Sequence, residues 1–321
     1  NSSAASDVYK RQLQNVVVVA QRKLGTEMAV LNTVRKSLPV VNGISAQQIS
    51  KTQDSDAAEV LRRIPGITIV DDRFIVVRGL AQRYNNVWLN NATTPSSETD
   101  SRAFSFDVLP SSLIDNMMIY KSPSAELPAD FSGGFVRVMT KNIPDGNTFN
   151  VSYQMGFNTN ATFRNFQLTD GTAKDYLGFG AGVRNLPSSF PAHLGEHSTD
   201  EAAAFTRQIN QRWGINKFTA IPDQKISLTS HRSYDVGGWK IGNITNLNWS
   251  TEFDYSETVN NNYIAYDVKN DVSRPRFEYN DIRYKNTSKL GALFNWSFQR
   301  DGSKYELSNF FSQRGVSALT Q

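Results

Sequence analysis

The chain contains no cysteine among its 321 residues, and this absence removes several kinds of chemistry at once. Thiol nucleophiles, zinc sites with cysteine ligands and disulfide frameworks are all excluded. The sequence also lacks any apolar run that approaches the roughly 18 residues of a membrane-spanning helix, which excludes a helical membrane protein. This absence does not exclude a membrane barrel, because only alternate residues of barrel strands face lipid.

Neither sign of charge dominates the sequence. The 34 lysines and arginines nearly balance 30 acidic residues, and the net charge is +4. The basic residues are scattered rather than gathered into a stripe, so we expect no nucleic-acid partner.

Histidine is scarce as well, but two of the three histidines lie in a suggestive pattern. His193-Leu-Gly-Glu-His197 matches the His-x-x-Glu-His motif of one class of zinc hydrolases. That chemistry requires the residues on one face of a helix, whereas Pro191 precedes this motif and Gly195 interrupts it. We therefore expect no enzyme: no catalytic residue, no metal and no cofactor.

The pattern of the sequence changes near Pro144. Downstream of it, apolar residues from Phe149 to Phe157 alternate with small and polar ones, which is a period of two. The pattern returns in later segments separated by alternately long and short connections, as in outer-membrane barrels. The strands are predicted at residues 149–163, 225–233, 239–255, 284–299 and 304–311.

Two of the connections are predicted to be tight turns, at residues 235–238 and at Asp301-Gly302. The connections after the first and third strands are predicted to be long polar loops. The faces expected to meet lipid carry Thr245, Leu247, Trp249, Thr251, Phe253 and Tyr255, then Leu290, Ala292, Phe294, Trp296 and Phe298. Leu293 breaks the alternation and is expected to touch the domain upstream.

Upstream of Pro144 the signals of helix and strand are mixed. Helices are predicted at residues 26–36 and from about Ser55 or Asp56 to 63, with Ser45 and Gln48 as a capping box between them. A helical turn is predicted at 113–117, and strands at 40–44, 67–70, 74–78, 87–90, 118–121 and 135–140. Without a βαβ rhythm, this pattern favours an α+β domain of about 120 residues.

Four stretches of this domain occur in an order typical of one family. They are AEVLRRIPGITIV (58–70), FIVVRGL (74–80), LPSSLIDNMMIYKSPS (109–124) and LPADFSGGFVRVMTK (127–141). In this order they closely resemble the plug of TonB-dependent outer-membrane receptors. Asn116, Ser122 and the Leu89-Asn-Asn91 run depart from the usual pattern and place the chain in a divergent branch.

The resemblance implies an α+β plug domain followed by antiparallel all-β transmembrane barrel strands, about five strands of a 22-strand barrel. Residues 22–145 would be the plug and 146–321 the N-terminal portion of the barrel. The family imports scarce ligands across the outer membrane of Gram-negative bacteria, with the plug facing the periplasm. TonB and its inner-membrane energising complex drive this import. The ligand stays open among an iron chelate, cobalamin, an oligosaccharide and a peptide. An alternative is a ligand sensor that signals through an N-terminal periplasmic extension.

Residues 1–21 are expected to lie outside the plug. Residues 1–12 resemble the translation of a transposon end, so they are interpreted as a sequencing artefact and the chain as an internal fragment. Residues 13–21 are similar to the TonB box, an extended segment that TonB binds by adding a strand. A first strand of the plug has the same composition, so both interpretations stand. The box-like residues are Asn15, Val16, Val17, Val18, Val19 and Ala20.

Polar loops of the plug are the candidate ligand site. Their donors, aromatic ring and charges of both signs suit ligand capture, although ordinary solvated loops have the same composition. The candidates are Arg83, Tyr84, Asn85, Asn86, Ser97, Glu98 and Arg102. The motif residues Pro65, Gly66, Arg78, Gly79, Pro123, Gly133 and Gly134 are interpreted as structural. Arg78 is expected inside the plug beside carboxylates, as a structural residue or as part of a releasable ion pair with the barrel wall.

Overall fold

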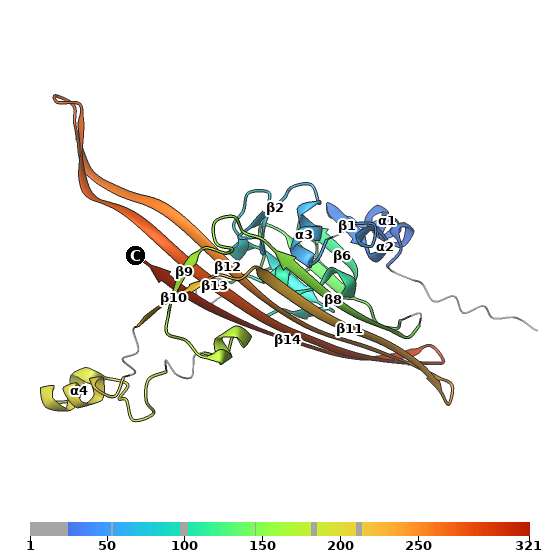
Figure 1. The fold of residues 1–321 in the computed structure, drawn as a ribbon. Helices are drawn as coiled ribbons and strands as arrows, with labels where there is room; N and C mark the ends of the chain where they lie inside the picture. The colour runs from blue at the N-terminus through green and yellow to red at the C-terminus, as the bar shows by residue number, and fades with distance from the viewer. Residues whose placement is uncertain (1–24, 53, 97–101, 145, 181–184, 210–213) are drawn as a thin grey trace, which may run out of the picture.

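The computed structural model describes residues 25–52, 54–96, 102–144, 146–180, 185–209 and 214–321. These residues form an N-terminal domain and a large curved sheet, shown in Figure 1. Within the described ranges, no helix combines the length and the apolar character needed to cross a membrane.

The N-terminal domain is built around a five-stranded sheet in the order β1-β6-β7-β4-β5. The strands are β1 (Val41–Ser45), β4 (Asn86–Leu89), β5 (Ala92–Thr93), β6 (Ile114–Tyr120) and β7 (Phe135–Thr140), and only β4 and β7 pair in parallel. A separate hairpin pairs β2 (Ile67–Val70) with β3 (Phe74–Val77). The helices are α1 (Glu27–Lys36), α2 (Ala46–Ile49) and α3 (Ala57–Arg62), with short 3₁₀ turns η1 (Gln82–Tyr84), η2 (Phe106–Val108) and η3 (Ser111–Leu113). Fully buried Leu61, Leu113, Met117, Ile119 and Val138 belong to its core.

Local capping explains where the helices begin. Thr26 caps α1 by accepting a hydrogen bond from the Ala29 amide, and Ser45 forms the predicted capping box with Gln48. Asp56 caps α3 through the Glu59 amide. The structure confirms both predicted helices to within a residue or so, at 26–36 and from about Ser55 or Asp56 to 63. It also confirms the strands predicted at 67–70, 74–78, 87–90 and 135–140.

The helical turn predicted at residues 113–117 is wrong. The turn η3 ends at Leu113, and β6 begins at Ile114. Strand β6 is the second strand of the sheet and pairs with β1 on one side and β7 on the other. Pairing on both sides outweighs the weak helical preference of the Leu-Ile-x-x-Met segment.

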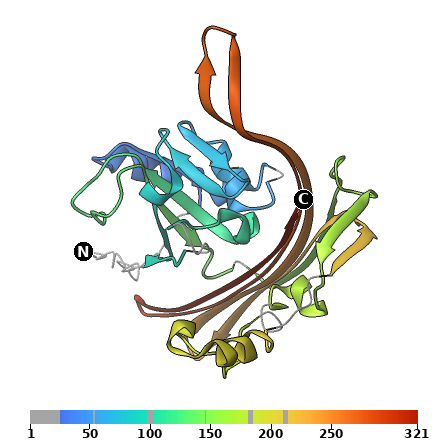
Figure 2. The same cartoon turned by 90° about the vertical axis from the view of Figure 1, so that its left-hand side faces the viewer.

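The large sheet has five antiparallel strands in the order β14-β13-β12-β11-β8. They are β8 (Thr148–Gly156), β11 (Asp223–Val236), β12 (Trp239–Asp267), β13 (Val272–Arg300) and β14 (Ser303–Thr320). Figure 2 shows the sheet curving around the N-terminal domain, which lies on its concave side. An α+β domain followed by antiparallel barrel-type strands is the predicted fold class.

The connections differ from the prediction in two places. The long loop expected after residue 255 is a turn at residues 268–271, because β12 and β13 pair along almost their whole length as one long hairpin. The first predicted strand stops at Gly156 instead of reaching residue 163. The connection that follows contains a strand pair, β9 (Asn165–Thr169) with β10 (Ile215–Thr219), the turns η4 (Ala173–Leu177) and η6 (Leu194–Glu196), and helix α4 (Thr199–Thr206). The His193–His197 motif thus lies on a 3₁₀ turn.

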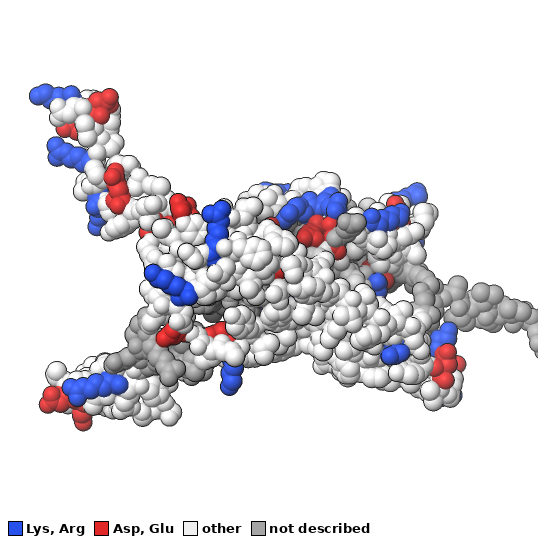
Figure 3. Space-filling model, viewed as in Figure 1, with Lys and Arg blue, Asp and Glu red and all other residues white. Residues whose placement is uncertain are grey.

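The outer, convex face of the sheet follows the predicted alternation in part. Tyr153 and Phe294 are exposed, as a lipid-facing surface requires. Figure 3 shows that much of this surface is free of charge, whereas charged side chains gather on the N-terminal domain, the β12–β13 tip and the turns. Thr251 and Phe253 do not meet lipid, because they are buried. Phe253 packs under Phe166 of β9 and Phe218 of β10.

Candidate functional site: the contact between the domain and the sheet

Two ion pairs, one partly buried and one nearly dry, join the N-terminal domain to the concave face of the sheet. The first unites Lys225 of β11 with Asp56, the cap of α3, at a distance of 3.2 Å between Nζ and Oδ2. The same Nζ lies 3.1 Å from the Ser55 hydroxyl oxygen. Burial raises the pKa of Asp56 above its ordinary value, and the charge of Lys225 only partly offsets this effect.

The second ion pair joins Asp107 of η2 to Lys289 of β13. The two side chains are 8% and 12% exposed, so this pair is nearly dry. Glu252 of β12 also reaches Lys289, at 3.0 Å, and the Ser105 hydroxyl donates to Asp107 at 2.7 Å. Burial acts to raise the pKa of Asp107, but the charge and hydrogen bonds of Lys289, with the Ser105 bond, outweigh it and the pKa is lowered.

The two lysines lie at one height on the sheet. Strand register places Lys225 opposite Ser250, Ser250 opposite Lys289, and Lys289 opposite Arg314. The sheet therefore presents a row of three cations to the N-terminal domain. Sequence reasoning missed these lysines, although each occupies an inward position of the predicted alternation.

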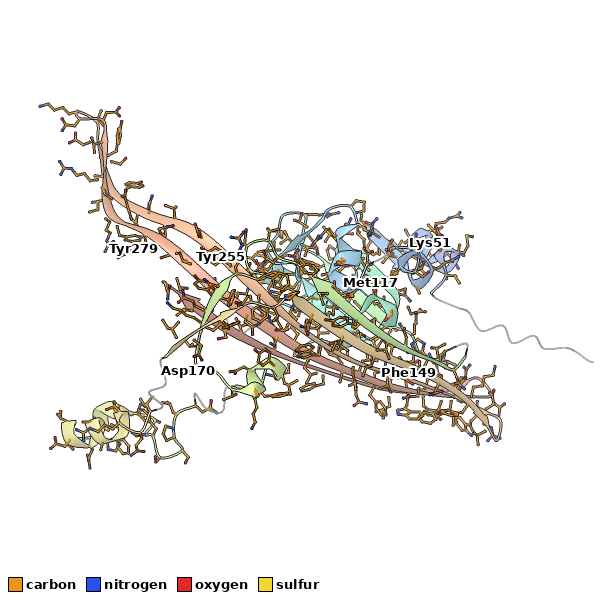
Figure 4. All side chains as sticks on the ribbon, viewed as in Figure 1. Lys51, Met117, Phe149, Asp170, Tyr255 and Tyr279 are labelled. Atoms are coloured by element: carbon orange, nitrogen blue, oxygen red, sulfur yellow. The ribbon has the colours of Figure 1, made fainter. Side chains whose placement is uncertain are left out.

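Apolar contacts reinforce the ion pairs. Ile244 of β12 and Leu293 of β13 are buried within the main core of the N-terminal domain. The expectation that Leu293 touches this domain is confirmed. Phe310 of β14 packs on Phe104 with the ring centroids 6.4 Å apart. Figure 4 shows Met117 inside the domain and Phe149 on β8 away from it.

Three of the motif residues, Pro65, Gly66 and Arg78, meet at one point of the N-terminal domain. The Arg78 amide donates to the Gly66 carbonyl at 3.0 Å, and the Lys121 ammonium donates to the Pro65 carbonyl. Gly66 and Gly79 both have positive φ, 75° and 78°, which glycine adopts without strain. The Pro-Gly and Arg-Gly segments are thus joined backbone to backbone, and the Lys121 side chain binds the Pro-Gly turn.

Arg78 does not lie where the sequence suggested. Its guanidinium is exposed and donates to the Lys121 carbonyl at 2.8 Å. Desolvating a guanidinium is costly, and a backbone carbonyl at the surface satisfies it without burial. The ion pairs with the sheet come from Asp56 and Asp107 instead.

The predicted ligand residues fall into two groups. Arg83 stacks over the Tyr84 ring at 4.9 Å, and both are near the surface. Asn86 is buried and donates to Asp130, which also receives Arg102 as an ion pair. These bonds lower the pKa of Asp130.

Asn85 is buried as well, and its amide donates to the Ile75 carbonyl at 2.8 Å, which makes it a packing residue of the domain. Ser97 and Glu98, and the box-like residues 15–20, lie outside the described ranges.

Comparison with protein families decides what the N-terminal domain is. Residues 33–135 match the model described as the TonB-dependent Receptor Plug Domain. These residues are a TonB-dependent receptor plug. The match covers the plug sheet from β1 to the first residue of β7. It includes Asp56 and Asp107, which pair with the two lysines of the sheet. The family is one of receptors and transporters, not of enzymes.

Several solved structures are similar to this chain. The chain is similar to the ferric enterobactin receptor of Pseudomonas aeruginosa (12% identity, 85% of this chain and 45% of that one, TM-score 0.33). It is also similar to the outer membrane transporter YddB of Escherichia coli (14%, 88% and 37%, TM-score 0.36). A third similar structure is the siderophore receptor PirA of Acinetobacter baumannii (13%, 89% and 49%, TM-score 0.33). The chain thus spans less than half the length of these three structures, and no curated protein matches it.

Proposed function

We propose that the full-length protein is a TonB-dependent importer of the outer membrane, in which this plug closes the barrel that the five strands begin. The observation that carries the proposal is the plug match together with the position of the plug on the concave side of an antiparallel sheet. The largely uncharged convex surface supports a lipid environment. The division of the chain at residues 12, 21 and 145 stays a prediction.

The plug–sheet contact suits a stopper that is held firmly at rest. Buried ion pairs add little net stability compared with apolar packing, but breaking one by removal of a partner is costly. They therefore fix the register of the plug against the wall, defined here as the concave face of the sheet. Energy supplied by TonB would have to act against this attachment.

The ligand is proposed to bind at the outward-facing loops of the plug. The exposed Arg83–Tyr84 pair and the Arg102–Asp130 ion pair offer charges and an aromatic face there. An iron chelate, cobalamin, an oligosaccharide or a peptide fits such groups. A ligand sensor would use the same plug and differ by signalling through an upstream extension, so uptake of ligand without a transcriptional response would favour the importer.

Replacing Val17 with proline is expected to abolish recognition by TonB. A bound TonB box adds a strand through backbone hydrogen bonds, and proline removes one donor. Binding of a synthetic peptide of residues 13–21 to the periplasmic domain of TonB, measured by calorimetry, tests this. The matched control is Val17→Ala, which keeps the amide and should bind nearly as well as the parent peptide. Equal binding by the proline peptide would show that residues 13–21 are not the box.

A further inference from the structure

A cavity of about 570 Å³ lies between the plug and one part of the wall. The plug side comes from the β4–β5 hairpin and the residues after it, with Thr93, Thr94 and Phe104 among its lining. The wall side comes from β13 and β14, with Asn295, Phe310 and Ser312. The cavity runs from the row of cations toward the short turn at Asp301-Gly302, because Arg314 and Ser308 mark its two ends on β14.

Uncharged hydrogen bonds close the cavity at the end nearer that turn. Asn90, in the turn between β4 and β5, exchanges hydrogen bonds of 2.9 Å with Thr140. Asn295 of the wall donates to the same threonine hydroxyl at 2.9 Å, and Asn90 lies 3.5 Å from the Ser308 hydroxyl. Amides and hydroxyls such as these exchange protein partners for water at small net cost.

The other side of the plug is attached differently. The Lys289–Asp107 pair is nearly dry and the Lys225–Asp56 pair is partly buried, so separating either pair while its surroundings stay dry leaves an unpaired charge, which is costly. The plug is therefore held by charge pairs near α3 and η2, and by uncharged hydrogen bonds at the turn between β4 and β5.

The outer strand of the hairpin is suited to local movement. Strand β5 has two residues, both exposed, and forms the edge of the plug sheet. The turn residues Asn90 and Asn91 have positive φ of 51° and 64°, a left-handed turn of the kind that closes two-residue hairpins. Moving β5 and this turn leaves β4 paired with β7, and β7 paired with β6.

We propose that the ligand crosses between strand β5 and the β13–β14 wall, and that β5 and its turn move aside while β4 stays paired with β7 and both lysine ion pairs stay formed. This inference rests on the importer function proposed above. It locates the path on one side of the plug and predicts that the plug remains in the barrel during passage.

Two crosslinked variants of the full-length protein test the path. The 321 residues contain no cysteine, so introduced pairs are unique here once any cysteines elsewhere are replaced by serine. One variant carries Asn90→Cys and Ser308→Cys across the cavity. The matched control carries Ser55→Cys and Lys225→Cys on the ion-paired side. It keeps the Asp56 cap and the Lys289–Asp107 pair, and the covalent bridge takes the place of the Lys225–Asp56 pair. Each pair is bridged with a short bis-methanethiosulfonate reagent, which a reductant removes.

The readout is potassium-ion conductance across planar bilayers as urea loosens the plug, which needs neither TonB nor a known ligand. The bridge from residue 90 to 308 is expected to abolish urea-induced conductance, and reductant should restore it. The bridge from residue 55 to 225 should leave the conductance in place. Before bridging, the Asn90→Cys variant should conduct at a lower urea concentration than the parent, since its closing hydrogen bonds are lost.

Other outcomes would overturn the proposal. If both bridges abolish conductance, the whole plug must leave; if neither does, or only the control bridge does, the path lies elsewhere. A parent protein that never conducts below the urea concentration at which its barrel unfolds would contradict the plugged-pore function itself, and the path with it.

Discussion

Replacing Lys289 with methionine is expected to lower the stability of the folded full-length protein by about 3–5 kcal/mol, because a buried carboxylate then lacks its cation. Asp107 is held in its charged form by this lysine, and the pair is almost fully shielded from water. Urea titration of the plug, followed by the protection of its amides against hydrogen exchange, measures the loss. The double variant with Asp107→Asn should recover much of it, since no unpaired charge remains.

The control is Lys225→Met, which removes the other ion pair. Its cost in unfolding free energy at neutral pH should be smaller and should shrink further as the solution is made more acidic, because the raised pKa of Asp56 lets this carboxyl take up a proton when its cation is gone. The lowered pKa of Asp107 has the opposite consequence. The charged Asp107 carboxylate stabilises the folded protein above the unfolded-state pKa of about 3.9, and this stabilisation is lost only as the pH falls through the lower pKa of the folded state. Equal costs for the two lysine variants at every pH would contradict this account.

Gly134→Val is expected to cost the plug about 3 kcal/mol, the upper end of the range for overpacking a core. A Cβ atom at this position would lie 2.8 Å from Val77 Cγ2 and 3.1 Å from Val77 Cβ, closer than packed atoms allow. The valine would push β3 away from the start of β7. The urea midpoint of the plug in the full-length protein measures the effect.

Gly146→Val is the matched control, because a Cβ atom there meets nothing within 4 Å. Its urea midpoint should stay close to that of the parent. If Gly134→Val is equally harmless, the close approach of β3 and β7 is not a requirement of the fold.

Local features of the plug were predictable from the sequence. Capping residues such as Ser45 and Asp56 act on amides two or three positions away, so the sequence carries the whole interaction. The period of two in β8, β11 and β14 is equally local. The β12–β13 hairpin was underestimated because apolar residues such as Val259, Ile264 and Tyr266 fall on both faces of its outer half, which hides the alternation.

The site was less predictable, because its partners are far apart in the chain. Lys289 meets Asp107 across 182 positions only because the sheet curves around the plug. The alternation of inward and outward residues could have identified Lys225 and Lys289 as residues that face the lumen. Which carboxylates they meet depends on how the plug is oriented. The position predicted for the Arg78 side chain was wrong for the same reason. The motif predicts a tight backbone junction but not the direction of the side chain.

The most direct test of the account is deletion of residues 22–145 from the full-length protein, followed by conductance measurements in planar bilayers without urea. If the N-terminal domain is a stopper, the deleted form should conduct as a wide, permanently open pore, and the parent should stay closed under the same conditions. A membrane-inserted deletion protein that remains as closed as the parent would contradict the central claim.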